Sequence, residues 1–130
     1  MIYLEKEDVI RLNQLGFKPP YESGEVYAYQ FYQYKNEEWS IGGQITGNES
    51  MLAPQEVFLE GLRLYTIDEI FDWIHIEGYG MRLLKNIGSG YKFIVFDKEA
   101  KEYKGSGGTL SKAIFKTIEK LLMKRKENQS

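Results

Sequence analysis

Residues 91–122 read YKFIVFDKEAKEYKGSGGTLSKAIFKTIEKLL, and this stretch of the 130-residue chain decides the fold. Its aromatic and β-branched start, residues 91–97, predicts a strand, and residues 100–104 predict a short edge strand whose lysines oppose further pairing. The glycines of residues 105–108 predict a flexible loop, after which Thr109 is suited to cap a helix. Apolar residues then recur at helical spacing, so we expect strands followed by a helix that covers them.

The sequence before this stretch predicts a similar series of elements. Residues 81–87 predict a strand that joins the next one through the hairpin turn Gly88-Ser89-Gly90. Thr66 and Glu69 have the spacing of a capping box, ahead of an apolar stripe of helical period. The N-terminal part predicts a helix, two strands joined by a polar turn, and a short third strand, over residues 5–16, 26–34, 39–45 and 56–60.

These elements predict an α+β fold in the order α-βββ-α-βββ-α, with antiparallel sheets covered by helices. The length is that of one domain, residues 1–130. Three strands and a Thr-led helix occur twice, so one interpretation is a pseudo-repeat of residues 1–77 and 78–126. The spacing between strands and helix differs between the two halves.

The composition excludes several kinds of site. The chain has no cysteine, which excludes disulfides, thiolate zinc sites and a cysteine nucleophile, and its one histidine, His75, excludes a pair of imidazoles. No apolar run reaches the roughly 20 residues of a membrane helix. We therefore expect a cytoplasmic protein that is not an enzyme, holds no metal or cofactor and does not enter a membrane. An enzyme that uses distant carboxylates is an alternative that stays open.

The charges divide unevenly along the chain. Residues 1–78 carry five basic and fourteen acidic side chains, a balance of −9, whereas residues 79–130 carry twelve basic and five acidic ones, a balance of +7. An acidic half can attract a basic groove, and a basic half can meet nucleic acid or an acidic protein. The alternative is that both halves are ordinary solvated surface or attract one another within the fold.

The first candidate binding surface is the tyrosine-rich strand and the turn that follows it. Neighbouring side chains of a strand point to opposite faces, so its rings are all buried only if both faces are covered. Otherwise one face exposes tyrosines, which are favoured in protein interfaces. The alternative is that they lie across sheet edges with solvated hydroxyls. The predicted partner-binding residues are Tyr27, Tyr29, Tyr32, Tyr34, Glu37, Glu38 and Trp39.

The second candidate is a row of lysines on the C-terminal helix. Four of them recur at i, i+4 spacing and would form one basic ridge that contacts nucleic-acid phosphates. The alternative is an ordinary solvated helix face. The residues of this row are Lys112, Lys116, Lys120 and Lys124.

The C-terminal stretch carries two resemblances. Residues 91–122 resemble small α/β sandwich proteins of bacterial viruses and prophages, in which a hairpin leads to a helix of pattern T-L-x-x-A-I-x-x-x-I; residues 109–118 read TLSKAIFKTI. This resemblance implies a viral or mobile-element origin. Residues 66–125 also look like a double-stranded-RNA-binding domain, whose last helix grips phosphates with lysines. Lys112 and Lys116 fall at that place, but the family's adjacent lysine pair is lacking.

The function favoured by these patterns is protein binding. We expect a small non-enzymatic module of phage or prophage origin that acts as an inhibitor or adaptor of a host protein. This host protein could be a nucleic-acid enzyme with a basic groove. The alternative is a nucleic-acid-binding domain that uses the basic C-terminal half. The chain would be a monomer or a homodimer, with its acidic and basic regions displayed separately to solvent.

Overall fold

The computed structural model describes residues 3–20, 29–42, 55–85, 88 and 90–129, and it has the predicted α+β fold with two three-stranded antiparallel sheets. The elements in chain order are α1 (Lys6–Gln14), β1 (Tyr29–Tyr34), β2 (Glu37–Gly42), α2 (Gln55–Glu60), β3 (Leu62–Leu64), α3 (Ile67–Ile76), β4 (Gly80–Lys85), β5 (Tyr91–Phe96), β6 (Glu102–Gly107) and α4 (Leu110–Gln129).

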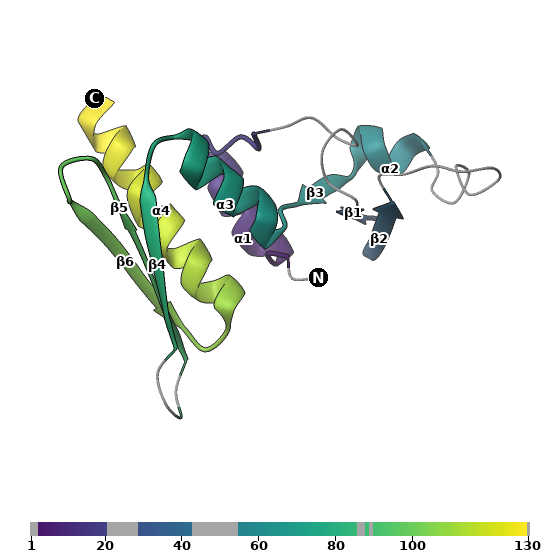
Figure 1. Ribbon diagram of the computed structural model, residues 1–130. Coiled ribbons are helices and arrows are strands. Elements are labelled where there is room, and N and C mark those ends of the chain that lie inside the picture. The colour runs from purple at the N-terminus through teal and green to yellow at the C-terminus, as the bar shows by residue number, and fades with distance from the viewer. Residues whose placement is uncertain (1–2, 21–28, 43–54, 86–87, 89, 130) are drawn as a thin grey trace.

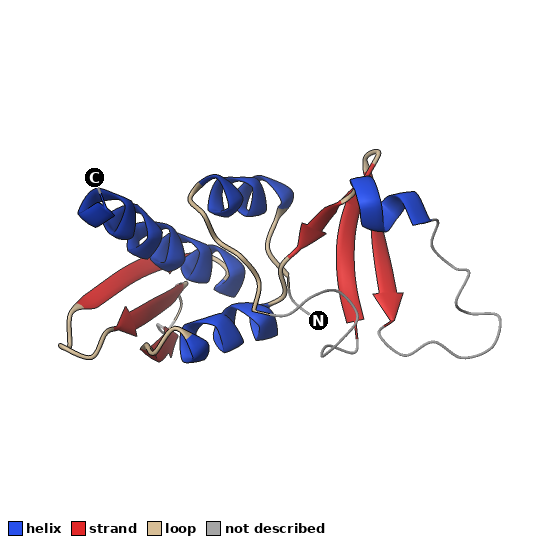
Figure 2. Ribbon diagram, turned by 90° about the horizontal axis from the view of Figure 1, so that it is seen from above, coloured by secondary structure: helices blue, strands red, loops and turns tan. Residues whose placement is uncertain are grey.

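The two sheets lie at opposite ends of an elongated molecule, with α1 and α3 between them (Figures 1 and 2). The first sheet has the strand order β2-β1-β3 and the second has the order β4-β5-β6. The central strand therefore comes first along the chain in one sheet and second in the other, so the two halves do not share one strand order. None of the described helices is long and apolar enough to span a bilayer.

The second sheet packs against α4 through glycines. A Cβ atom on Gly105 would lie 2.6 Å from the backbone nitrogen of Thr117, and one on Gly107 would lie 2.9 Å from that of Ala113. Residues 105–107 were predicted as part of a flexible loop, and this prediction is wrong, because β6 continues to Gly107. Glycine is rare in strands, but here it lets a helix approach the backbone closely.

The first sheet differs from its prediction at its third strand. Residues 56–60 form part of helix α2, and the strand that pairs with β1 is Leu62–Leu64 instead. Glu56 and Glu60 are one helical turn apart, while Val57 is fully buried, a spacing that suits a helix better than a strand.

The β1–β2 hairpin turns at Lys35 and Asn36, both of which have positive φ angles, 50° and 66°. Such a two-residue turn matches the twist of the flanking strands, and asparagine tolerates the left-handed conformation well. The second strand therefore begins at Glu37, two residues earlier than predicted.

The helix starts at Thr66 and Thr109 are confirmed. The backbone N–H of Glu69 donates to the Thr66 hydroxyl at 3.2 Å, and the N–H of Lys112 donates to the Thr109 hydroxyl at 3.2 Å. Each hydroxyl satisfies an amide that has no partner within its helix.

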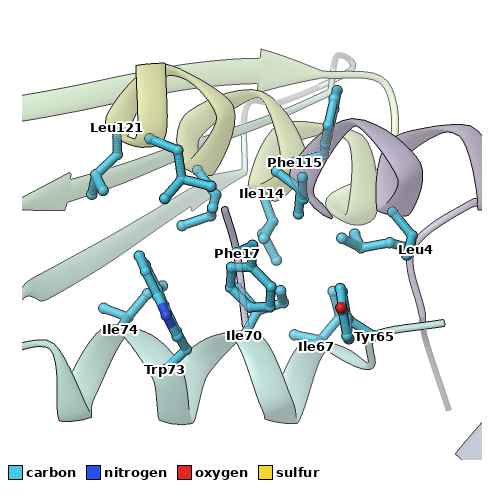
Figure 3. Close-up of a cluster of buried hydrophobic side chains, with 14 of the residues drawn as sticks. Leu4, Phe17, Tyr65, Ile67, Ile70, Trp73, Ile74, Ile114, Phe115 and Leu121 are labelled. Atoms are coloured by element: carbon cyan, nitrogen blue, oxygen red, sulfur yellow. The ribbon is translucent and has the colours of Figure 1, made fainter. Parts of the chain in front are cut away.

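One hydrophobic core joins α1, α3 and α4 to the second sheet. In Figure 3, Ile67, Ile70, Trp73 and Ile74 of α3 face Ile114 and Leu121 of α4, with Phe17 between them. Phe93 and Val95 of β5 belong to the same cluster and are fully buried. Among the described side chains of the first sheet, Leu64 of β3 is buried within it, while Phe31 and Leu62 are partly buried and pack against it.

Candidate functional site

An acidic surface lies at the far end of the first sheet, where the hairpin turn meets α2. We define it by Tyr34, Glu37, Glu56, Leu59 and Glu60. The turn puts Tyr34 directly opposite Glu37, and the Tyr34 hydroxyl donates to a carboxylate oxygen of Glu60 at 3.1 Å. This hydrogen bond ties the hairpin to α2, so two segments that lie apart in the chain form one surface.

The acidic surface combines carboxylates with an exposed apolar side chain. Leu59 is 74% exposed, and the three glutamates Glu37, Glu56 and Glu60 are also exposed. An exposed leucine among carboxylates gives a partner both an apolar contact and a charged rim, which is the usual composition of a protein interface. Sequence reasoning missed Leu59 because this segment was predicted as a strand.

Glu38 is held by the N-terminal segment. The Tyr3 hydroxyl donates to the Glu38 carboxylate, and the Tyr3 ring stacks on Phe31 with 4.6 Å between ring centroids. The hydrogen bond to Glu38 raises the pKa of Tyr3, and burial and the charge of Glu38 act in the same direction. Tyr3 therefore fixes this carboxylate relative to the first sheet.

The predicted tyrosine surface is wrong at Tyr32. This side chain is only 3% exposed, and its hydroxyl donates to the amide oxygen of Gln30 at 3.3 Å. Helix α2, which contributes the buried Val57, packs against β1, and Tyr34, on the same face of the strand as Tyr32, bonds to Glu60 of that helix. The ring of Tyr32 is therefore not available to a partner.

The other predicted residues of this surface have mixed outcomes. Trp39 is half-buried, and its indole N–H is buried without a hydrogen-bond partner. The backbone of Tyr29 lies in β1, but its side chain is outside the described part of the structure, and all of Tyr27 is outside it. Tyr34 and Glu37 are the predicted residues that the structure brings together beside Glu60, whereas Glu38 is exposed on the opposite face of the sheet, where it contacts Tyr3.

A buried ion pair links the first sheet to α3. A guanidinium nitrogen of Arg63 on β3 lies 3.0 Å from a carboxylate oxygen of Glu69, whose side chain is fully buried. Burial raises the pKa of Glu69, while the charge of Arg63 and hydrogen bonds from Arg63 and Thr66 act against that increase. The sequence pattern predicted only a capping role for Glu69 and gave no sign of Arg63 as its partner.

The lysine row of α4 does not form one free ridge. Lys112 lies 2.7 Å from a carboxylate oxygen of Asp8 and 3.4 Å from one of Glu5. Lys120 donates to the backbone carbonyl of Lys104 at 2.5 Å. Lys124 lies 3.4 Å from Glu127, and Lys116 is exposed.

Ion pairs also join the acidic and basic halves of the chain. Arg11 lies 3.0 Å from Glu119, and Arg125 lies 2.8 Å from Glu77, so α4 is bound to both α1 and α3 by opposite charges. The expected separation of charge is therefore only partial.

Within the described ranges, no group of three or more histidine, aspartate and glutamate side chains could hold a metal ion. The one histidine of the chain, His75, is exposed on α3.

Comparison with protein-family models, with curated proteins and with solved structures finds no match for this chain. The resemblance of residues 91–122 to phage and prophage proteins thus stays a prediction.

Proposed function

We propose that this protein is a non-enzymatic binding module that docks its acidic surface against a basic surface of a partner protein. As an inhibitor or adaptor it would cover a groove that the partner uses for another polyanion, such as nucleic acid. The observation that carries this proposal is the exposed Leu59 within a group of three exposed glutamates, Glu37, Glu56 and Glu60.

Two physical arguments support this role. Exposed carboxylates of one sign attract a basic partner over a distance of about one Debye length, roughly 8 Å at physiological ionic strength. The exposed leucine and the Tyr34 ring then offer apolar area that loses water on contact. Charge would set the rate of association, and the apolar contact would set how long the complex lasts.

The nucleic-acid alternative has less support. It needs several adjacent lysines free to contact phosphates, whereas Lys112 contacts two carboxylates and Lys124 contacts a third. We therefore do not propose the α4 row as the functional surface.

The test compares two charge reversals that change the net charge equally. Glu37→Lys with Glu56→Lys alters the acidic surface, and Glu7→Lys with Glu99→Lys alters exposed acids elsewhere. Each immobilised protein is exposed to host-cell extract, and retained proteins are quantified by mass spectrometry. We expect the first variant alone to lose a protein that the wild type retains.

The purified partner then allows a kinetic measurement. Reversal at Glu37 and Glu56 should slow association at least tenfold at low salt, and the difference should shrink as salt screens the charges. Equal retention by all three proteins, or association rates that do not differ, would remove the proposal.

A further inference from the structure

Strand β4 is an edge strand that leaves apolar side chains in solvent. It pairs with β5 on one side only, and none of its residues from Gly80 to Lys85 is buried. Met81 is 38% exposed, Leu83 is 44% exposed and Leu84 is 47% exposed. Three partly exposed apolar side chains on one six-residue strand are unusual for a sheet edge.

This edge lacks the features that usually block further pairing. The register between β4 and β5 is continuous over six residue pairs, without a bulge, and the strand contains no proline. The guanidinium of Arg82 reaches across the sheet to Glu102 of β6 and lies 5.3 Å from the centroid of the Phe96 ring. The ammonium of Lys85 lies 4.8 Å from the centroid of the Tyr91 ring on β5.

The backbone groups along the free edge can therefore accept another strand. Both cations of β4 turn towards the neighbouring strands, which leaves the row of outward N–H and C=O groups uncovered by them. An extended chain that pairs there gains main-chain hydrogen bonds, and its side chains gain contacts on both faces of the sheet.

The register tells which side chains an added strand would meet. Leu83 lies opposite Phe93, which faces the core beneath α4, so Met81 and Leu83 lie on the helix side of the sheet. Arg82 and Leu84 lie on the other side, since side chains alternate along a strand. An occupant that fits would carry apolar residues on the helix side and acidic residues on the other side, where Arg82 and, on β5, Lys92 lie.

The net positive charge of the second sheet favours an acidic segment as the added strand. Residues 80–107 carry six basic and three acidic side chains. Two copies of this sheet placed edge to edge would therefore bring like charges together, which opposes a symmetric dimer through β4. An acidic chain is attracted by the same charges.

We propose that β4 binds an extended segment of a partner protein by strand addition, and that this segment alternates acidic with apolar residues. The site lies on the second sheet, is basic, and is independent of the acidic surface on the first sheet. A module with both surfaces could hold two partners of opposite charge at once.

The test uses a synthetic seven-residue peptide of alternating glutamate and valine with blocked ends. Two control peptides carry lysine in place of glutamate, or proline in place of the central valine. Binding is followed by chemical-shift changes and by hydrogen exchange of the β4 amides. We expect the acidic peptide to shift β4 resonances and to slow exchange at alternate β4 amides, whereas the two controls do neither.

Matched variants locate the contact. Leu83→Asp should weaken binding of the acidic peptide at least tenfold, and Leu59→Asp, which alters an exposed leucine on α2, should leave it unchanged. Should Leu83→Asp fail to fold, Arg82→Glu replaces it, with Lys98→Glu as its control. This replacement variant should weaken binding of the acidic peptide about threefold, less than the tenfold effect expected for Leu83→Asp.

Three outcomes would overturn the proposal. The acidic peptide does not bind at millimolar concentration, the control peptides bind equally well, or the wild type forms a dimer that Leu83→Asp dissociates. The last result would assign the edge to a second copy of this chain.

Discussion

The two sheets of this protein are built around similar central strands that are covered in different ways. In the second sheet, Phe93 and Val95 of β5 are fully buried against α4, and both neighbouring strands pair along six residues. In the first sheet, β1 pairs with β3 over only three residues, and its Phe31 is only partly buried. The helix that covers its other face, α2, has six residues.

This difference separates the part of the molecule that holds the fold from the part that carries the candidate site. The core contains α1, α3, α4 and the second sheet, while the first sheet joins it through Leu64, the Tyr3–Phe31 stack and the Arg63–Glu69 pair. Functional surfaces are often found where local stability is lower. The acidic surface on the first sheet fits that pattern.

The largest expected effect on stability comes from removing the phenylalanine ring of a central strand, either Phe93 of β5 or Phe31 of β1. Phe93→Ala should lower the free energy of unfolding by about 3–5 kcal/mol, because it empties a fully enclosed site in the core. Phe31→Ala should cost clearly less, because that ring lies at the border of the core. Chemical denaturation followed by circular dichroism measures both. Equal losses would contradict the assignment of the main core to the second sheet.

The next effect tests the link between the first sheet and α3. Arg63→Met leaves the buried Glu69 carboxylate without its cation and should cost about 3 kcal/mol at pH 7. The pKa of Glu69 is already raised in the folded state by burial, and removing Arg63 raises it further. The folded state then binds a proton more readily than the unfolded state does.

The sign of the pH dependence follows from that raised pKa. Stability falls as the pH rises from the ordinary carboxyl range, about 4.3, through the folded-state pKa of Glu69. The cost of Arg63→Met should therefore be largest at pH 7 and smallest near pH 4. In the double variant Arg63→Met with Glu69→Gln this pH dependence should disappear. A cost of Arg63→Met that does not change with pH would show that Glu69 does not titrate as described.

The sequence predicted the parts of this fold that depend on local signals. Thr66 and Thr109 mark helix starts because a hydroxyl caps amides within one turn of itself, and this needs no distant partner. The antiparallel sheets followed from aromatic strands separated by short turns.

The errors lie where a distant segment decides the outcome. Gly105 was predicted in a loop because glycine is depleted in strands, but α4 requires a position without a side chain there. Tyr32 was predicted at the surface because a strand with aromatic residues on both faces exposes one of them unless both are covered, and the helix α2 that packs against β1 lies in a segment that was predicted as a strand. The pairing of Lys112 with Asp8 joins residues 104 positions apart, and no local pattern indicates it.

The smallest of the three effects tests how closely α4 approaches the second sheet. In Gly105→Ala the new Cβ would lie 2.6 Å from both the backbone nitrogen and the hydroxyl of Thr117. That hydroxyl donates to the carbonyl of Phe93 at 2.8 Å, so the methyl group would disturb the bond that fastens α4 to β5. We expect a loss of about 2 kcal/mol, the range of a tightly overpacked site. Gly108→Ala is the matched control, because nothing lies within 4 Å of its new Cβ, and its change should stay within about 0.5 kcal/mol. If both variants keep wild-type stability, α4 lies further from β6 than the glycine contacts indicate.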